Sequence, residues 1–220
     1  MFKILLICIF FPVFSFGQMA SIELDVKPLP EPVIRDMTVE QWNLSQSHFK
    51  DLSAKSQDFL YWINLCRNNP SRFWDSVVVP AIHCFPQLNG PEAKSLRAEL
   101  LLSGPLPMFS VSSALVQTAQ FHATDISNKL SHPGHNSTDG TDFGTRMKRA
   151  GIKYCANENI AISSQSTLLA VLLLYLDIGL PEKGHRKSLL NPMLVETGIG
   201  SSKYGKDQHF FVQDLSCAQQ

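Results

Sequence analysis

The sequence predicts an α/β protein, a three-layer α/β/α sandwich in which helices cover both faces of a small, mainly antiparallel sheet. Segment 166–176, STLLAVLLLYL, is apolar on every side, which is typical of a helix buried all round. Near the C-terminus, Phe210, Phe211 and Val212 follow one another without a polar residue, which predicts a strand covered on both faces. A sheet buried on both faces needs helices on both sides.

Composition and charge exclude several classes of protein. The chain has 220 residues, of which 44% are hydrophobic and 17% charged, and 19 Lys and Arg balance 19 Asp and Glu. A disordered chain would need low hydrophobicity and high net charge, and collagen or a coiled coil would need a periodic bias. The balanced charge argues against a nucleic-acid partner, because phosphate binding requires a surplus of cations. One globular domain is the expectation for this length.

The first residues resemble a secretory leader. Lys3 precedes an apolar run from Ile4 to Phe16, and small residues stand at Ser15 and Gly17. This pattern predicts a signal peptide over 1–17, cleavage after Gly17, and a secreted, extracellular or periplasmic protein. The run is shorter than the ~20 apolar residues of a spanning helix, and no later run is longer, so we expect no membrane span in the mature chain. A retained N-terminal anchor is the alternative.

Cysteine usage agrees with export. Four cysteines follow the leader: Cys66, Cys84, Cys155 and Cys217. In an oxidising compartment this number predicts two disulfides, with three possible pairings. For Cys66 a free, buried thiol is the alternative, because it shares a helical stripe with Phe59 and Ile63.

The remaining elements are predicted from periodicity and from chain breakers. Three prolines between residues 28 and 32 predict an extended lead-in over 18–37, and Thr38 followed by Gln41 is a possible helix start. A helix over 56–68 should end at Asn69-Pro70. The other predicted elements are helices at 71–83, 91–102, 112–130 and 166–176, a short helix between Gly184 and Asn191, and a hairpin with strands at 195–201 and 208–215 joined by a turn at 204–206.

Residues suited to metal binding or proton transfer gather between His122 and His185. The long polar loop 131–146, SHPGHNSTDGTDFGTR, is too long to be a simple connection and is therefore a candidate site. The spacing matches no compact metal motif, so these side chains meet only if the fold brings them together. The set comprises His122, Asp125, His132, His135, Asp139, Asp142, Glu158, Asp177, Glu182 and His185.

Several strings in this region resemble the CAP superfamily of cysteine-rich secretory proteins, venom antigens and plant pathogenesis-related proteins, particularly its bacterial members. They are GHNSTDGTDFGTRMKRAG, NENIAI, LYLDIGLPEKGHRKSLLNP, ETGIG and FFVQDL. Upstream, GPLPMFSVSSALVQTAQFHATDI and FLYWINLCRNNP also resemble that superfamily. The resemblance covers about 56–217 and implies a CAP (SCP-like) domain over 56–220, preceded by an extension over 18–55.

The resemblance also implies a cavity lined by two histidines and two acids. Matched position by position, these are His135, Glu158, Asp177 and His185, with Asp177 where eukaryotic members have Glu. His132 is the rival for the first histidine, and His122 is a further candidate for the cavity wall. His135 and His185 would be the ligands of a divalent metal such as Zn²⁺, and the acids would orient the rings or a metal-bound water.

Two functions fit these expectations. In the first, the protein is a non-catalytic extracellular binding module for a lipid, sterol, cell-wall fragment or partner protein. In the second, it is a metal-assisted hydrolase, a peptidase or esterase, with Glu158 or Asp177 as general base. The resemblance favours the binding module, and the chain lacks a Gly-x-Ser-x-Gly nucleophile motif. A polar network that needs no ligand is the structural alternative for the four residues.

Overall fold

The computed structural model describes residues 21–25, 27–33, 35–164 and 166–219, so the predicted leader lies outside the described residues. The predicted α/β sandwich is confirmed. A four-stranded sheet in the order β1-β3-β4-β2 forms the middle layer, with β1 parallel to β3 and the other pairs antiparallel. The strands are β1 Ser110–Val111, β2 Ala156–Ser163, β3 Glu196–Tyr204 and β4 Gln208–Ser216. No helix in the described part of the chain is long and apolar enough to cross a membrane.

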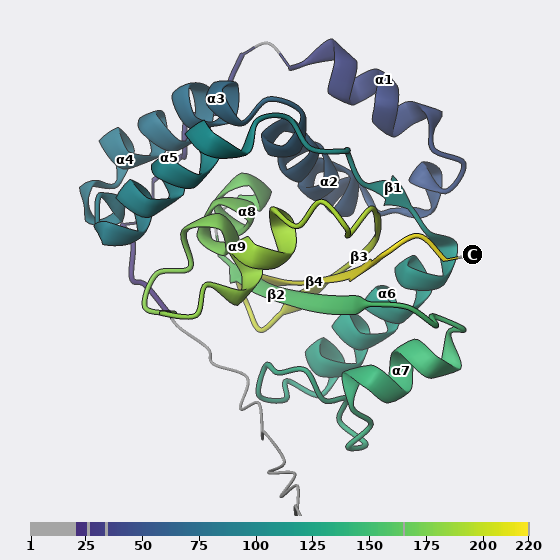
Figure 1. Ribbon diagram of the computed structural model, residues 1–220. Coiled ribbons are helices and arrows are strands. Elements are labelled where there is room, and N and C mark those ends of the chain that lie inside the picture. Colours follow the sequence, from purple (N-terminus) through teal and green to yellow (C-terminus); the bar gives the residue numbers. More distant parts are fainter. Residues whose placement is uncertain (1–20, 26, 34, 165, 220) are drawn as a thin grey trace, which may run out of the picture.

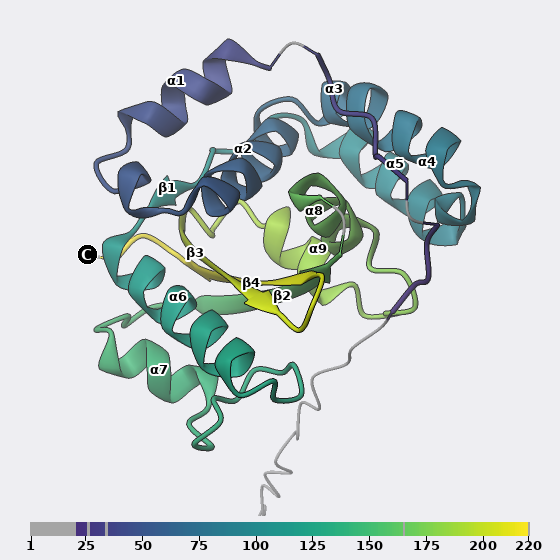
Figure 2. The same ribbon diagram turned by 180° about the vertical axis from the view of Figure 1, so that it is seen from behind.

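Helices cover both faces of this sheet. In Figures 1 and 2, α6 and α7 lie on one side, whereas α2, α8 and α9 lie on the other, with α1 and α3 to α5 farther out. The helices are α1 Met37–Ser45, α2 Ala54–Asn68, α3 Pro70–Phe73, α4 Val79–Cys84, α5 Pro91–Ser103, α6 Ser113–Asn128, α7 Phe143–Arg149, α8 Thr167–Leu176 and α9 Gly184–Leu189.

Strand β4 is buried on both faces, as its apolar run predicts. Phe210 and Val212 pack with Ala119 and Ala123 of α6, whereas Phe211 points into the main core on the opposite face. Alternation along a strand places neighbouring residues on opposite faces, so three successive apolar residues serve both cores. The helix at 166–176 is likewise confirmed as α8, and its side chains are nearly all buried.

Two glycines let α6 lie directly on β3. A Cβ atom on Gly198 would lie 2.0 Å from the Leu115 backbone, and one on Gly200 would lie 2.2 Å from the Ala119 carbonyl oxygen. Backbone atoms cannot give way to such contacts, so only glycine permits this distance between helix and strand. The motif ETGIG therefore sets the position of α6 and of the loop that follows it.

The helix predicted over 71–83 is instead three helical pieces. α3 is followed by a π-helical turn over Trp74–Val78 and then by α4. Pro80 provides the physical reason, because it has no N–H to donate to the carbonyl of Ser76 and an α-helical turn is disfavoured there.

The described part of the extension packs on the core, to which it contributes Leu29, Val39 and Leu52. Helix α1 begins at Met37 with Asp36 as its N-cap, so the predicted start at Thr38 is slightly late. The Asp36 side chain accepts hydrogen bonds from the backbone of Thr38 and Val39. Val39 is fully buried, which joins α1 to the rest of the fold.

Some elements were not predicted. Helix α7 occupies residues assigned to the end of the polar loop, and Asp142 caps it by accepting from the Thr145 N–H at 2.9 Å. Strand β2 pairs with β4 along its whole length, from Ala156 opposite Ser216 to Ser163 opposite His209. Because its other edge is unpaired among the described residues, β2 is an edge strand.

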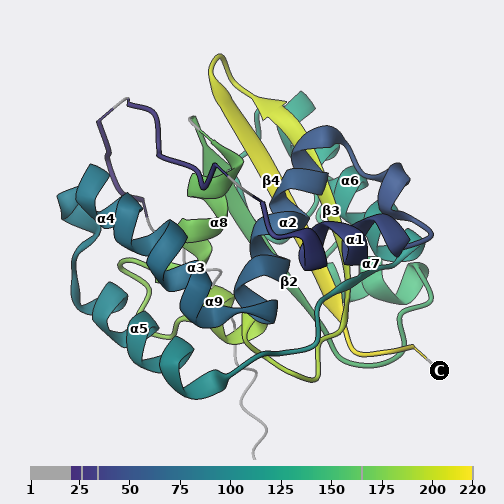
Figure 3. The same cartoon turned by 90° about the horizontal axis from the view of Figure 1, so that it is seen from above.

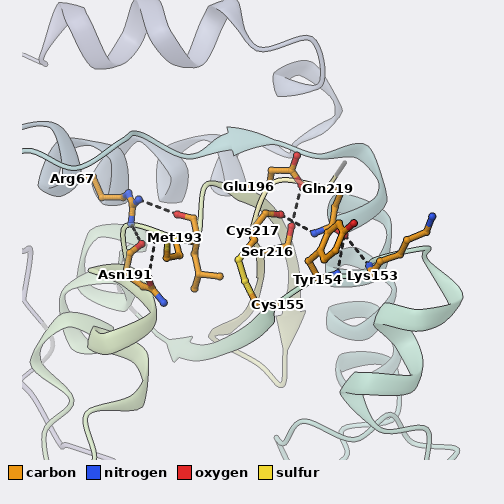
Figure 4. The surroundings of a disulfide bond; sticks show 11 residues. Arg67, Lys153, Tyr154, Cys155, Asn191, Met193, Glu196, Ser216, Cys217 and Gln219 are labelled. Carbon is orange, nitrogen blue, oxygen red and sulfur yellow. Dashed lines mark hydrogen bonds between the residues drawn. A yellow bond between two sulfur atoms is a disulfide. The ribbon is translucent and has the colours of Figure 1, made fainter.

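One disulfide, Cys155–Cys217, is present among the described residues, which corrects the expectation of two. It ties the chain just before β2 to the residue after β4 (Figure 4). Cys66 and Cys84 are free. Burial raises the pKa of the Cys66 thiol to about 12, so this cysteine behaves as a small apolar core residue.

Candidate functional site

The first half of the site is a buried carboxylate on the edge strand β2. Glu158 has a side chain that is only 1% exposed, and its Oε1 accepts a hydrogen bond from Nδ1 of His135 at 2.8 Å. Its Oε2 accepts from the buried guanidinium of Arg146 on α7. Burial alone would raise the pKa of Glu158, but the His135 hydrogen bond and the Arg146 charge outweigh it, and the pKa is lowered. Glu158 is therefore a carboxylate.

The loop that carries His135 is fixed at several points. Arg146 donates to the His135 carbonyl oxygen at 2.8 Å, in addition to its ion pair with Glu158. Asp125 of α6 accepts from the N–H of Thr138 at 2.7 Å and from its hydroxyl at 2.5 Å. The backbone at His135 and at Thr138 is thus held by charged side chains, which preorganises the imidazole.

His122 provides a third support from inside the protein. Its Nε2–H donates to the carbonyl oxygen of Gly134 at 2.8 Å, and its ring lies 6.5 Å from the ring of Phe210, centroid to centroid. Burial lowers the pKa of His122, against the opposing charge of Glu158. His122 is therefore a neutral, structural residue, and it shares the buried face of α6 with Ala119 and Ile126.

The second half of the site lies at the end of α8. Asp177, with a fully buried side chain, accepts from Nδ1 of His185 at 2.5 Å through one oxygen and from the Arg186 N–H at 2.9 Å through the other. Asp177 adopts the left-handed conformation, with φ 51°, and terminates the helix. Asp tolerates this conformation better than longer acids, which explains why a short acid suits this position.

Arg186 fixes the helix that carries His185. It is fully buried, donates to the carbonyl oxygens of Tyr175, Leu176 and Glu92, and pairs with the Glu99 carboxylate at 2.9 Å. These contacts join α9 to both α8 and α5. Its role is therefore to pair with an acid and hold the backbone.

One cavity of about 330 Å³ joins the two histidines. The lining includes Ile160, which packs on the α6 side of the sheet, and Ala161, which packs on the main core, so the cavity lies at the edge of strand β2. The cavity lies between β2, α8 and the segment 21–24. Its lining comprises Ser21, Ile22, Leu24, Gly134, His135, Ile160, Ala161, Ile162, Ser163, Ser164, Leu169, Leu173, Leu174, Asp177, Ile178, Leu180, His185 and Gln208.

Three of the residues expected to line this cavity do not line it. The carboxylate of Glu158 lies behind His135 and Arg146, which cover both of its oxygens. His122 is buried beneath the loop, and His132 is exposed on the loop surface. Of the two candidates for the first histidine, His135 is the one that lines the cavity and contacts the acid.

Asp214 belongs to the same cluster but was not among the predicted site residues. It lies directly opposite Glu158 across β2 and β4, and it accepts from the Thr118 hydroxyl at 2.6 Å through Oδ2. Oδ1 has no hydrogen-bond partner among the described residues. Burial, together with the charge of Glu158, raises the pKa of Asp214 well above its usual range. The acidic residue in the largely apolar string FFVQDL was the available signal.

The donors suit a divalent metal only in part. Each histidine gives its Nδ1–H to a carboxylate, which leaves Nε2 as an acceptor and matches the support that metal-binding histidines usually have. The described residues contain no group of three or more His, Cys, Asp or Glu side chains placed to hold an ion. A metal here would have the two imidazoles as ligands and would complete its coordination from water or a ligand.

Comparison with protein families gives one match. The family model described as the cysteine-rich secretory protein family, CAP, matches residues 96–215, which is more than half of the chain. No curated protein matches this chain.

Three solved structures that are similar to this chain come from bacteria. An extracellular protein containing an SCP domain from Bacillus anthracis is 27% identical, with a TM-score of 0.40, over 51% of this chain and only 35% of that chain. An outer surface protein from Borrelia burgdorferi is 17% identical, with a TM-score of 0.44, over 58% and 90% of the two chains. A cysteine-rich secretory protein from Staphylococcus aureus is 16% identical, with a TM-score of 0.35, over 59% and 40%.

Proposed function

Because the chain belongs to the CAP family of cysteine-rich secretory proteins, we propose that it is an extracellular binding module for an uncharged, largely apolar small molecule. One observation carries this proposal: a single cavity combines an apolar wall with two imidazoles whose Nδ1 atoms are already bonded to acids. The predicted leader and the disulfide support an oxidising compartment outside the cytoplasm.

The charges around the cavity define the class of ligand. Its lining, among the described residues, includes neither lysine nor arginine, and the Arg146 charge is already paired with Glu158. The Asp177 carboxylate adds negative charge next to His185. An anionic headgroup would therefore find no free cation, whereas a hydroxyl can donate to an imidazole Nε2. Aliphatic side chains from β2 and α8 match an apolar body.

The hydrolase alternative has less support. A general base must contact the water that it activates, but the side chains of Glu158 and Asp177 are only 1% and 0% exposed, and all four of their oxygens already accept hydrogen bonds within the protein. Their hydrogen bonds orient the histidines. This arrangement favours binding over hydrolysis.

Probe binding tests the proposal. The chain from residue 18 is titrated with the neutral apolar fluorophore 1-aminoanthracene, which is then displaced with long-chain primary alcohols. Leu173→Trp, which fills the cavity from α8, should abolish binding. Leu102→Trp places the same bulk on a residue that is 87% exposed and should bind like wild type. Equal binding by both variants, or no binding by wild type, would refute the proposed cavity function.

Zinc binding is tested separately. Calorimetric titration of Zn²⁺ should give heat with wild type and none with His135→Ala/His185→Ala. The control is His48→Ala/His132→Ala, in which two exposed histidines are removed. Equal heats from all three proteins would remove the metal role without affecting the result with the apolar probe.

A further inference from the structure

Exposed and partly buried residues alternate along the segment 21–25, and its partly buried residues line the cavity. Ile22 and Leu24 are partly buried, pack against the main core and line the cavity, whereas Glu23 and Asp25 are exposed and do not line it. Ser21 is exposed but also contributes to the lining. An extended chain directs every second residue to the same side, so the spacing of Ile22 and Leu24 places both side chains on the inner face. This segment precedes the family-matched residues 96–215 and is an addition to them.

The residues that follow hold this segment in place. Leu29 is buried in the core at 8% exposure, and the Lys27 ammonium lies 5.1 Å from the centre of the Phe85 ring. Prolines at 28, 30 and 32 restrict the backbone to extended conformations. In Figures 1 and 2 the purple segment runs from α1 past α3 and α4 toward the loop after α8. It is therefore an anchored part of the fold.

Beyond Leu29 the chain is fixed again at the start of α1. The Arg35 guanidinium lies 3.5 Å from the centre of the Tyr61 ring and pairs with Asp58 at 2.9 Å. Both partners belong to α2, most of whose residues are buried. The segment before Arg35 is consequently attached at both ends of its proline-containing part, which suits a permanent wall better than a mobile cover.

We propose that Ile22 and Leu24 are specificity-determining residues, which form one apolar wall of the ligand site and limit the length of the apolar chain that it accepts. Ile160 and Ile162 of β2 and Leu173 of α8 contribute other parts of the lining, and the two histidines form its polar part. This inference rests on the proposed function, because it assigns a role within the same cavity.

The wall has a measurable consequence for affinity. Ile22→Ala/Leu24→Ala removes apolar surface from the site, so binding of 1-aminoanthracene should weaken by about tenfold or more. The preferred chain length among displacing primary alcohols should become longer, because the cavity is enlarged. Ile22→Trp reduces the cavity, so the preferred alcohol should become shorter. If Ile22 and Leu24 only stabilised the fold, the two changes would not shift the preferred alcohol length in opposite directions.

Matched variants complete the experiment. Val33→Ala alters a fully exposed residue of the same proline-containing segment and should bind like wild type, and Ile22→Leu/Leu24→Ile should restore binding. If wild type binds the probe, Leu173→Trp does not, and the double alanine variant retains both affinity and chain-length preference, the wall is refuted while the cavity function stands. Tighter binding by the alanine variant would mean that the segment plugs the cavity, which also overturns the proposal.

Discussion

The two imidazole–carboxylate pairs look alike but are built differently. Glu158 lies on a strand and shares its charge between His135 and the guanidinium of Arg146. Asp177 caps a helix in the left-handed conformation and has His185 and a single backbone N–H as its partners. The His135 side chain is 40% exposed, whereas that of His185 is 20% exposed.

Because of this difference, removing a histidine should have a different effect on stability in the two pairs. The Glu158 carboxylate keeps the Arg146 guanidinium as a partner when His135 is removed, but Asp177 has no Lys or Arg side chain as a partner among the described residues. In the first pair, removal of the acid should therefore destabilise the protein more than removal of the histidine. In the second pair, removal of the histidine should itself be destabilising. Figure 3 shows α6 and α7, which support the first pair, on the opposite side of the strands from α8.

The largest effect is expected for Glu158→Ala. This change leaves the Arg146 guanidinium, which is 4% exposed, without a counter-charge. Removing one partner of a buried ion pair costs roughly 3–5 kcal/mol. Urea unfolding at pH 7 measures the loss. Glu182→Ala, on a side chain that is 83% exposed, is the control and should change little. A loss as small as that of the control would contradict the assignment of a desolvated pair.

The histidines should rank in a defined order. His185→Ala leaves the buried Asp177 with one hydrogen bond, so we expect a loss of about 1–3 kcal/mol. His135→Ala leaves Glu158 paired with Arg146, and this more exposed contact should contribute less than about 1 kcal/mol. Unfolding of both variants in urea, with the exposed His132→Ala as reference, checks the ranking. The reverse order would show that the two pairs are not built as described.

The smallest effect concerns Asp214 and depends on pH. The pKa of Asp214 in the folded protein is raised well above its ordinary value of 3.8. At a pH between the ordinary pKa and the raised pKa, the folded state therefore holds a proton that the unfolded state has lost. The contribution of Asp214 to the stability of the wild type should therefore fall as pH rises through this window. Asp214→Asn removes the titrating group, so its stability relative to wild type should increase with pH.

Denaturant unfolding at several pH values from 4 upward measures this slope. Asp207→Asn, at an exposed position in the β3–β4 turn, is the matched control. Parallel curves for wild type and Asp214→Asn would show that the Asp214 carboxyl does not hold its proton in the folded state.

Most of the fold was predictable because its strongest signals are local. The apolar run of α8 and the consecutive apolar residues of β4 each report burial directly, and both predictions are confirmed. Helix α7 escaped prediction because it is short and its start depends on the Asp142 cap within a polar loop. Strand β2 escaped because pairing with β4, rather than any local signal, gives it its conformation.

The site was predictable only in part. The resemblance identified His135, Glu158, Asp177 and His185, and the structure brings each histidine against one of the acids. Whether a residue lines the cavity depends on what covers it. Arg146 and His135 cover both oxygens of Glu158, and Arg146 comes from the helix that was not predicted. Sequence periodicity contains no such information.

By itself, the sequence determined the α/β class, the order of its strongest helices, the hairpin and the four residues of the two pairs. These follow from hydrophobic periodicity, chain breakers and motif resemblance, all of which are local along the chain. The tertiary structure alone decided which cysteines pair, that Asp214 faces Glu158, and that Ile22 and Leu24 reach the cavity. Each of these is a contact between distant segments, and such contacts depend on how the helices and strands pack together.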